Sequence, residues 1–318
     1  MDSRPTHIVL GAGGAIGVPL AEKLIARNER VTLVSRRGHS MTGATTVRAD
    51  LTVAPQARRC IEPSSIVYLV AGLPYAASVW KAKWPRLIEN TIAACQENQA
   101  RLVFLDNVYM YGKVEGVMTE ETPVNPCSRK GEVRARVAEA VLSAIRQRSV
   151  KAIIARSADF YGPYAGRSST PNSLVILRMM KGEKAYWLAE ASFRHSLTYT
   201  LDCAEALILL GAAEDTYNQI WHLPTAHPAP TGAEFISMVA VNLGVEPSLI
   251  ELKRWLLQSA GLFSRLIREA VEMIYQSESD YLFDSTKFER RFSFSPTPYA
   301  EGVRNTIEYF RQHPPKFS

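Results

Sequence analysis

Residues 7–17 read HIVLGAGGAIG, and this stretch decides the fold. The apolar run HIVL predicts a short buried strand, and glycines follow it directly with the spacing GxxGxxG. A helical pattern over 15–28 comes next. Glycines permit a tight turn and a close approach of backbone N–H groups to a pyrophosphate, and the helix N-terminus adds a favourable partial charge. In this context the motif predicts dinucleotide binding, rather than a flexible glycine turn, through Gly11, Gly14, Ala15, Ile16 and Gly17.

Strands and helices alternate through the first half of the chain. Further short runs rich in Val, Ile and Leu predict strands over 31–35, 46–49, 66–70, 101–105 and 151–155. Two more helical patterns lie between them, over 79–99 and 127–148. Short apolar strands separated by helices imply βαβ units and a parallel sheet covered on both faces. The predicted fold class is therefore α/β, a Rossmann-type doubly wound parallel sheet.

The pattern changes after about residue 160. Gly, Pro and Ser cluster over 162–173, and helical periodicity then dominates, over 202–213, 231–243, 248–276 and 298–312. Gly244 and Gly261 are expected to be breaks or caps of these helices. Strand-like pieces near 197–200 and 219–223 could still join the first sheet. We therefore expect a dinucleotide-binding Rossmann domain over residues 1–160, with sheet contributions from about 195–223, and a smaller, mainly helical substrate lobe over 161–318.

The composition is that of an ordinary soluble globular protein. Of 318 residues, 47% are hydrophobic and 21% are charged, and no apolar run approaches the ~20 residues of a membrane span. The N-terminus lacks the pattern of a secretion signal, and the four cysteines lie far apart without a CxxC pair. The net charge of +6 is mild, no nucleic-acid motif appears, and the six histidines show no HxxxH or HExxH spacing. We expect a cytoplasmic protein with no nucleic-acid, membrane or metal partner.

The richest basic stretch runs from Arg129 to Arg136 and also carries Glu132, four residues before Arg136. Opposite charges at i,i+4 stabilise exposed helices. We therefore interpret this stretch as a solvated helix face rather than a binding patch for anions.

The end of the second strand bears on the choice of cofactor. A protein that binds NAD usually places Asp or Glu there, against the ribose 2′-hydroxyl. Here the residues are Ser35, Arg36 and Arg37, and two guanidinium groups suit the extra phosphate of NADP. The sequence therefore favours NADP as the cofactor over NAD.

Two further strand ends would receive the adenine half of the cofactor. Asp50 and Leu51 close the third strand, where the Asp50 carboxylate can accept a hydrogen bond from the adenine amino group. Val70, Ala71 and Gly72 close the fourth strand. Such small residues would let the adenine and ribose lie against the backbone.

Together these features resemble the extended short-chain dehydrogenase/reductase superfamily, which also contains the NAD-dependent epimerase/dehydratases. The resemblance runs over nearly the whole chain. Its motifs are GAGGAIG, RADL near residue 50, LVAG at 69–72, LVFLDNVYMYG at 102–112, RSADFYGP at 156–163 and HSLTYTLDCAEAL at 195–207. The resemblance adds Asn90 and Ser157 to the predicted cofactor-binding residues. It also implies a possible homodimer that forms through the helices over 79–99 and 127–148.

The chain departs from that family at every catalytic position. The family's fifth strand ends in Ser or Thr, which hydrogen-bonds the substrate oxygen, and the matching residue here is Asn107. The family's next helix supplies YxxxK, in which Tyr exchanges the proton and Lys lowers its pKa. Cys127 and Gly131 stand at these two positions. The pattern resembles the atypical branch of the superfamily, which keeps the fold and the cofactor loop without the catalytic set.

Other residues could take over these roles. Tyr109 stands two residues after Asn107, where its phenol could donate a proton to the substrate or could pack as an ordinary aromatic residue. Lys130 lies one residue before the family's lysine position, and one residue rotates a side chain by ~100° around a helix. We therefore favour a solvated lysine there, and a small buried thiol at Cys127. The predicted catalytic residues are Asn107 and Tyr109, with Lys130 as a further candidate.

Four residues are predicted to face the substrate. The family's nucleotide-sugar enzymes place Asn after the sixth strand to hold the substrate diphosphate, whereas Asp159 here would repel it. Tyr75 and Phe160 suit a less polar ligand, although each could also be a core residue. His195 could be a donor that switches with pH or a structural histidine.

Three functions remain open at this point. The leading hypothesis is an NADP(H)-dependent oxidoreductase of atypical type, which transfers a hydride to or from a small or medium, largely apolar carbonyl, imine or activated alkene. The second is a non-catalytic NADP-binding regulator, because the Ser/Tyr/Lys set is missing. The third is a sugar-nucleotide epimerase or dehydratase. The retained substrate lobe favours an enzyme over a regulator.

Overall fold

The computed structural model describes residues 4–314, and the chain folds into two compact units. Unit 1 comprises the chain through Met110, residues Arg129–Ser157 and residues Cys203–Trp221. Unit 2 comprises Tyr111–Ser128, Ala158–Asp202 and the chain from His222 onward. Three separate stretches of sequence therefore build each unit.

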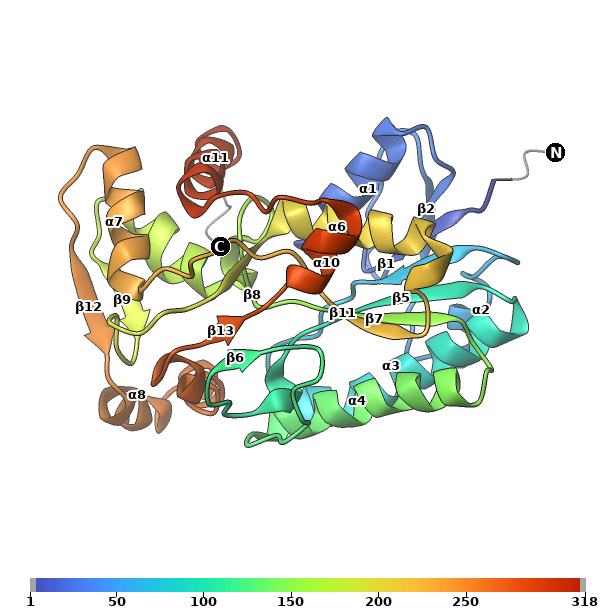
Figure 1. The fold of residues 1–318 in the computed structure, drawn as a ribbon, viewed down its shortest axis with the longest axis horizontal. Coiled ribbons are helices and arrows are strands. Elements are labelled where there is room, and N and C mark those ends of the chain that lie inside the picture. The colour runs from blue at the N-terminus through green and yellow to red at the C-terminus, as the bar shows by residue number, and fades with distance from the viewer. Residues whose placement is uncertain (1–3, 315–318) are drawn as a thin grey trace. The chain divides into compact units, whose positions relative to one another are not determined.

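A seven-stranded sheet forms the middle of unit 1, with the strand order β11-β7-β5-β4-β1-β2-β3 (Figure 1). The pairs from β3 through β7 are all parallel. The strands are β1 (His7–Leu10), β2 (Val31–Ser35), β3 (Thr45–Arg48), β4 (Ile66–Leu69), β5 (Arg101–Asp106), β7 (Ala152–Arg156) and β11 (Gln219–His222). This confirms the predicted doubly wound parallel sheet.

The order of the strands reverses between β1 and β4. The chain runs outward from β1 to β2 and β3, then returns to place β4 on the other side of β1. In open α/β sheets, ligands bind at such a switch point, beyond the carboxyl ends of the strands. The glycine loop after β1 and the small residues after β4 lie at this point.

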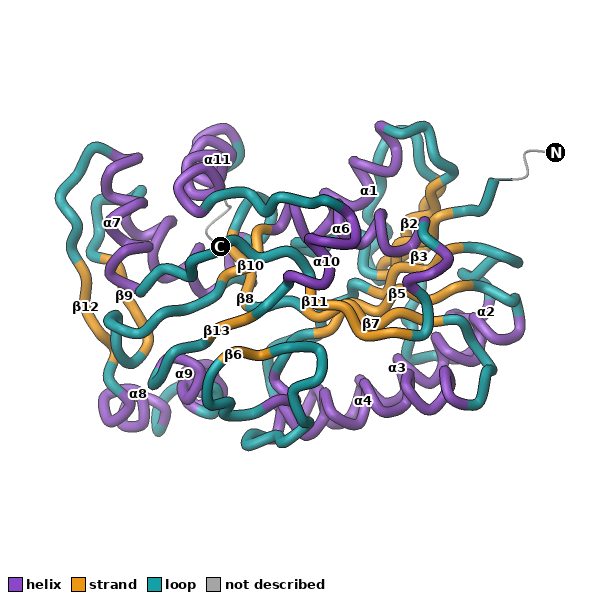
Figure 2. The backbone as a smooth tube through the Cα atoms, viewed as in Figure 1, coloured by secondary structure: helices purple, strands orange, loops and turns teal. Residues whose placement is uncertain are grey.

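Helices cover both faces of the sheet in unit 1. One face carries α1 and α6, and the other carries α2, α3 and α4 (Figures 1 and 2). The helices are α1 (Gly17–Ala26), α2 (Ala54–Arg58), α3 (Ala77–Glu97), α4 (Arg129–Arg146) and α6 (Thr200–Ala212), with a short 3-10 turn, η4 (Glu214–Thr216). The predicted helices over 15–28, 79–99, 127–148 and 202–213 are thereby confirmed with shifted ends, whereas α2 was not predicted.

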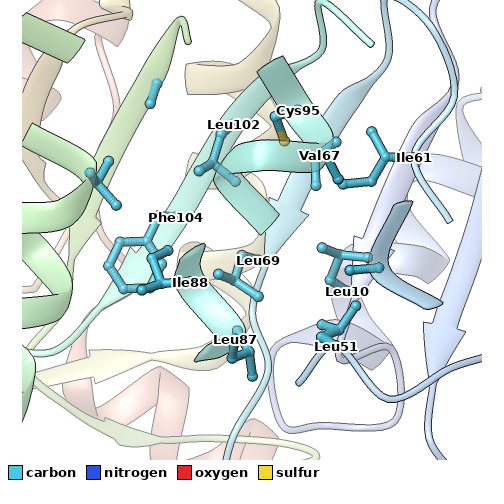
Figure 3. Packing of buried hydrophobic residues seen from close by; sticks show 14 of the residues in the cluster. Leu10, Leu51, Ile61, Val67, Leu69, Leu87, Ile88, Cys95, Leu102 and Phe104 are labelled. Carbon is cyan, nitrogen blue, oxygen red and sulfur yellow. The ribbon is translucent and has the colours of Figure 1, made fainter. Parts of the chain in front are cut away.

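The main core of unit 1 lies between the sheet and the face formed by α2, α3 and α4. Successive residues of a strand point to opposite faces of the sheet. Leu10, Leu69 and Phe104 therefore pack in this core. Val9, Tyr68 and Val103 are buried on the other face of the sheet. Figure 3 shows the strand residues against Leu87, Ile88 and Cys95 of α3. Strands that are apolar on both faces explain the continuous Val, Ile and Leu runs in the sequence.

Unit 2 contains three small parallel sheets, each of two strands. The pairs are β8 (Asp159–Tyr161) with β10 (Leu197–Tyr199), β9 (Ala185–Leu188) with β12 (Leu249–Leu252), and β6 (Val117–Met118) with β13 (Leu282–Phe283). Its helices are α5 (Leu177–Met179), α7 (Gly232–Leu243), α8 (Arg254–Gly261), α9 (Arg265–Val271), α10 (Thr286–Phe292) and α11 (Tyr299–Gln312), with short turns η1 (Tyr109–Tyr111, shared with unit 1), η2 (Gly166–Ser168), η3 (Asn172–Ile176) and η5 (Ile274–Ser277).

The core of unit 2 is rich in aromatic rings. Tyr161 contacts Tyr199, Phe235 and Tyr299, with ring centroids 5.4–5.7 Å apart. Helix α7 begins with a capping box, in which Thr231 and Glu234 satisfy each other's backbone N–H groups. The sequence TGAE carries this signal, and the predicted helices over 231–243 and 298–312 correspond to α7 and α11.

Two predictions for the second half of the chain are wrong. The stretch 248–276 is not helical at its start, because Leu249–Leu252 forms β12, which pairs with β9, and Lys253 is extended before α8. The predicted break at Gly261 is confirmed, since α8 ends there and α9 begins at Arg265. The piece near 197–200 forms β10, which pairs with β8 and not with the large sheet. The piece near 219–223 does join the large sheet, as β11.

A buried histidine at the start of β1 makes stability depend on pH. Burial lowers the pKa of His7 below its usual 6.5, against the opposing charge of Glu29. The unfolded chain therefore binds a proton more readily, and this contribution to stability is lost as the pH falls below about 6.5. We expect urea unfolding to give a smaller free energy at pH 5.5 than at pH 7.5, with a weaker pH dependence in His7→Gln.

The exposed His313→Gln variant is the matched control for this titration and should keep the wild-type pH dependence. An unchanged pH dependence in His7→Gln would contradict the assignment to His7.

Candidate functional site

The glycine loop of unit 1 packs tightly against the end of β4. Gly11 has φ +104°, and a Cβ built on it would lie 2.5 Å from the Cα of Ala71. A Cβ on Gly17 would lie 2.3 Å from the carbonyl oxygen of Gly11. Real Cβ contacts are never this short, so both positions require glycine. The loop thereby brings its backbone close to the switch point of the sheet.

The same loop offers hydrogen-bond donors to an anion. Gly14 N–H donates to the Gly11 carbonyl at 3.0 Å, but no backbone carbonyl within residues 4–314 accepts from Ala15 or Ile16 N–H. Helix α1 follows with no acidic residue in its first turn and no side-chain cap. The donors and the positive end of the helix fit a pyrophosphate, as the predicted cofactor site requires.

Arg36 and Arg37 are exposed directly after β2, and Ser35 is held inside the turn. The Ser35 Oγ accepts a hydrogen bond of 2.8 Å from the backbone N–H of His39. His39 lies against Gly13, and its Nε2 is buried without a hydrogen-bond partner. Sequence reasoning missed His39, which no motif marks. Its position next to the glycine loop adds it to the candidate cofactor site.

The predicted adenine residues form a connected loop after β3. The Asp50 carboxylate accepts from the hydroxyl and N–H of Thr52 at 2.7 and 2.9 Å. These bonds lower the pKa of Asp50, and the charge of Arg36 lowers it further. Asn90 donates to the Leu51 carbonyl at 2.9 Å, which ties α3 to this loop. Asn90 is thus placed as a structural anchor of the loop that carries Asp50.

Exposure to solvent increases along the three residues at the end of β4, Val70, Ala71 and Gly72. Val70 is buried, Ala71 is half-buried and Gly72 is exposed. A Cβ on Gly72 would meet no protein atom within 4 Å. The protein itself therefore does not require glycine at this position.

Aromatic rings connect three predicted site residues of unit 1. Tyr109 stacks on Trp80 with centroids 6.1 Å apart, and Tyr75 meets the edge of Trp80 at 5.7 Å. The ammonium of Lys130 lies 4.6 Å from the centroid of the Tyr75 ring. Asn107 stands two residues before Tyr109, and its Oδ1 accepts from the Tyr109 N–H at 3.1 Å. We call Tyr75, Trp80, Asn107, Tyr109 and Lys130 the aromatic cluster.

Lys130 is fully buried, so its interpretation as a solvated lysine is wrong. A buried ammonium is costly unless a polar or aromatic partner compensates it, and the face of Tyr75 supplies such a partner. The interpretation of Cys127 as a buried thiol is also wrong, since this cysteine is exposed. Gly131, at the family's lysine position, is buried.

A buried ionic group lies at the end of β5, next to Asn107 of the aromatic cluster. Asp106 accepts from the Arg134 Nε at 2.7 Å and from the Asn107 N–H at 2.9 Å. Arg156 Nε lies 3.9 Å from the other Asp106 oxygen, and all three charged side chains are at least 97% buried. The Arg134 guanidinium also covers the rings of Trp84 and Phe104.

This ionic group corrects the interpretation of 129–136 as a solvated face. Glu132 and Arg136 do form an exposed i,i+4 pair at 3.7 Å, but Lys130 and Arg134 point inward from the same helix. One signal could have revealed the group. Asp106 and Arg156 each close a neighbouring strand, and the register of β5 and β7 pairs them directly. Ser157 follows and donates from its N–H to the Asp106 carbonyl at 3.1 Å.

Unit 2 brings together two of the predicted substrate residues. His195 Nε2 lies 3.1 Å from the Asp159 Oδ2, and the His195 ring stacks on Tyr281 at 4.5 Å. Phe160 is the next residue on β8 after Asp159, and it is half-buried. The structure therefore places Asp159 and His195 as a pair in unit 2.

Three further polar groups near this pair were not predicted. Tyr275 Oη, Gln276 Nε2 and Tyr281 Oη are buried and make no hydrogen bond within the usual geometry. Burial is the main cause that raises the pKa of both tyrosines, so both phenols stay protonated donors, and the Asp159 charge adds to the shift. All three residues line a small pocket with the loop over 112–118. A ligand oxygen or a water could satisfy these donors.

These features define an α/β protein of the Rossmann type, with a glycine loop at the switch point of its parallel sheet. The sequence over residues 7–221 matches the family described as the NAD dependent epimerase/dehydratase family, and the chain belongs to this family. The family assignment agrees with the resemblance seen in the sequence motifs. No curated protein matches the sequence.

Solved structures share the fold over almost the full length of both chains. The chain is similar to a UDP-glucuronic acid 4-epimerase from Bacillus cereus in complex with NAD and a fluorinated UDP-glucuronic acid, with a TM-score of 0.81 and 15% identity over 97% of this chain and 99% of the other. It is also similar to a dTDP-glucose 4,6-dehydratase from Bacillus anthracis in complex with NAD, with a TM-score of 0.78 and 13% identity over 98% and 97%. At such identities the likeness shows the fold alone.

Proposed function

We propose that the protein is an enzyme that transfers a hydride between a nicotinamide dinucleotide and a small carbonyl, imine or activated alkene. The glycine loop carries this proposal, because its backbone excludes any Cβ at Gly11 and Gly17 while Ala15 and Ile16 N–H stay available for an anion. Family membership supports a nicotinamide cofactor. When bound, that cofactor would supply or accept the hydride.

The aromatic cluster supplies groups for the proton and the substrate oxygen. The Asn107 Oδ1 already accepts from the Tyr109 N–H, so the amide NH₂ is the end that can donate to a carbonyl oxygen. The Tyr109 phenol is the proposed proton donor. The buried Lys130 ammonium adds a positive charge to the same cluster, which favours negative charge that develops on the phenol or the substrate oxygen.

Substitutions of this cluster test the proposed roles. We expect Tyr109→Phe to lower kcat for NADPH-dependent reduction by roughly 10²–10⁴-fold, because a general acid contributes about that much. Asn107→Ala should also lower kcat, whereas Tyr186→Phe, a half-buried tyrosine of β9, should not. A panel of ketones, imines and enones provides the substrates. Binding of NADPH without any consumption across the panel would favour the regulator instead.

The choice of NADP over NAD rests on the two exposed arginines after β2. We expect the double variant Arg36→Ser with Arg37→Ser to bind NADPH more weakly by roughly 100-fold or more in calorimetry, since it loses two hydrogen bonds to charged groups, each worth about 1.5–3 kcal/mol. Its affinity for NADH should stay unchanged. The same change made at Arg58 and Arg59, at the C-terminal end of α2, is the control. Equal weakening for both cofactors would contradict a 2′-phosphate contact.

A sugar-nucleotide epimerase or dehydratase is the second candidate. The similarity to such enzymes over nearly the whole chain favours it. The Asp159 carboxylate and the lack of YxxxK count against it. Turnover of UDP- or dTDP-sugars by the purified protein, or NAD that copurifies with it, would select this candidate over the reductase.

A further inference from the structure

A third arginine lies beside the turn that carries Arg36 and Arg37. Strand β3 is the edge strand of the large sheet in unit 1, next to β2 (Figure 2). Its last residue, Arg48, pairs in register with Ser35, the last residue of β2. The Nε–H of Arg48 donates a hydrogen bond of 3.0 Å to the Arg36 carbonyl oxygen. The guanidinium group of Arg48 is therefore held at the turn that follows β2.

The Arg48 guanidinium keeps most of its hydrogen-bonding capacity. A guanidinium group carries N–H donors on every nitrogen, and the bond to Arg36 uses only the donor on Nε. The donors on its terminal nitrogens make no hydrogen bond or ion pair with any residue over 4–314. Guanidinium and phosphate groups often form bidentate pairs through parallel N–H···O bonds. Arg48 can therefore offer such a contact while its Nε stays bound to the protein.

The charges around this turn favour an anion. Arg36, Arg37 and Arg48 are all exposed, and no carboxylate in the described part of the chain forms an ion pair with any of them. Asp50 is the acidic residue whose charge interacts with Arg36, and its Oδ1 is occupied by the N–H and hydroxyl of Thr52. The three guanidinium groups therefore outweigh this carboxylate. A phosphate monoester, with about 1.5–2 negative charges at pH 7, would compensate the excess.

We infer that Arg48 of β3 binds the 2′-phosphate of NADP, together with Arg36 and Arg37, and is the arginine of this site that is held in place before the cofactor arrives. The inference rests on the proposed choice of NADP. The side chains of Arg36 and Arg37 make no hydrogen bond within residues 4–314, so each must lose rotamer freedom when it binds a phosphate. Arg48 loses less, because its Nε is already bound.

Protection of the sheet edge is an alternative role for Arg48. Charged side chains on an edge strand oppose pairing with another chain, and most residues of β3 are exposed. This role requires only that the charge extends into solvent. The Arg48 guanidinium is instead bound to a carbonyl group at the carboxyl end of β2, where the cofactor ribose lies in proteins with this fold. The bond therefore favours a contact with the cofactor.

Calorimetry on the purified full-length protein tests this inference with NADPH, NADH, adenosine 2′,5′-bisphosphate and adenosine 5′-monophosphate. Within each pair the ligands differ only by the 2′-phosphate. We expect Arg48→Gln to bind NADPH and the bisphosphate roughly 10–100-fold more weakly, because it loses a hydrogen-bonded contact to a charged group. Its affinity for NADH and the monophosphate should stay unchanged. Arg48→Lys keeps the charge without the planar fork, so its loss should be smaller than that of Arg48→Gln.

Arg136→Gln is the matched control, because it removes the charge of an exposed arginine on α4 of the same unit. This variant should bind all four ligands like the wild type. Arg59 donates to the Arg48 carbonyl at 2.9 Å, so it contacts the backbone of Arg48 and not its guanidinium. The double control at Arg58 and Arg59 should therefore leave the phosphate contact in place. Thermal unfolding verifies that each variant is folded before its affinities are compared.

The other outcomes overturn the inference in distinguishable ways. Equal weakening of NADPH and NADH in Arg48→Gln would place Arg48 against a part that both cofactors share. Unchanged affinities, with or without aggregation of the variant, would remove Arg48 from the phosphate site and leave protection of the edge. If the wild type prefers NADPH and Arg48→Gln keeps that preference, only this inference fails. If the wild type binds NADPH and NADH equally, the proposed choice of NADP fails as well.

Discussion

Asp106→Asn is expected to lower the free energy of unfolding by about 3–5 kcal/mol, the cost of breaking a buried ion pair from one side. Asp106 is the buried counter-charge of Arg134 and lies 3.9 Å from the Arg156 guanidinium. The asparagine keeps the size of the side chain but leaves buried positive charge uncompensated. Urea unfolding at neutral pH measures the loss, and a marked fall in Tm should accompany it.

Glu132→Gln is the matched control for this change, because it removes a carboxylate from an exposed pair on the same helix as Arg134. Surface pairs contribute little, so the free energy of unfolding should stay within about 0.5 kcal/mol of the wild type. Similar losses in both variants would contradict the role of Asp106 as the buried counter-charge of Arg134 and Arg156.

Gly17→Ala should destabilise the protein by roughly 1–3 kcal/mol or more, the range for overpacking. Its added Cβ would lie 2.3 Å from the Gly11 carbonyl oxygen and 2.9 Å from the Ala12 Cα, so backbone must move. Because the loop that moves carries Ala15 and Ile16, NADPH binding should weaken together with Tm. Thermal unfolding and calorimetry provide the two readouts.

Gly72→Ala tests whether the cofactor contacts this residue, without a change in the packing of the protein itself. The added Cβ meets no protein atom within 4 Å, so Tm should not change. If the adenine and ribose lie against this backbone as proposed, NADPH affinity should nevertheless fall. An unchanged affinity would remove Gly72 from the cofactor site, whereas a fall in Tm would contradict the open surroundings of this residue.

The fold of unit 1 could be predicted from the sequence because the signals for its strands and helices are local. The apolar runs and the glycine spacing predict β1, the loop and α1, and neighbouring βαβ units then follow from periodicity. Unit 2 was harder, since its sheets have only two strands of two to four residues each, and such pairs depend on contacts between distant segments. The helical periodicity predicted from residue 248 was wrong for this reason, since Leu249–Leu252 pairs with β9.

Site residues could be predicted where a sequence motif fixes their position in the fold. They could not be predicted where the role of a side chain depends on whether it is buried. Asn107 and Tyr109 follow β5 directly, so their placement at its end was foreseeable. Lys130 was interpreted as solvated because it stands one residue before the family's lysine position, whereas its ammonium is buried against the ring of Tyr75. Tyr275 and Tyr281 belong to a stretch without any motif.

The alternation of the chain between the two units has a practical consequence for work with fragments. The backbone passes from one unit to the other after Met110, Ser128, Ser157, Asp202 and Trp221. A fragment that ends near residue 160 would lack α6 and β11, and would leave an edge of the large sheet uncovered. Neither half can be expressed separately as a self-sufficient piece, so binding and turnover must be studied on the whole polypeptide.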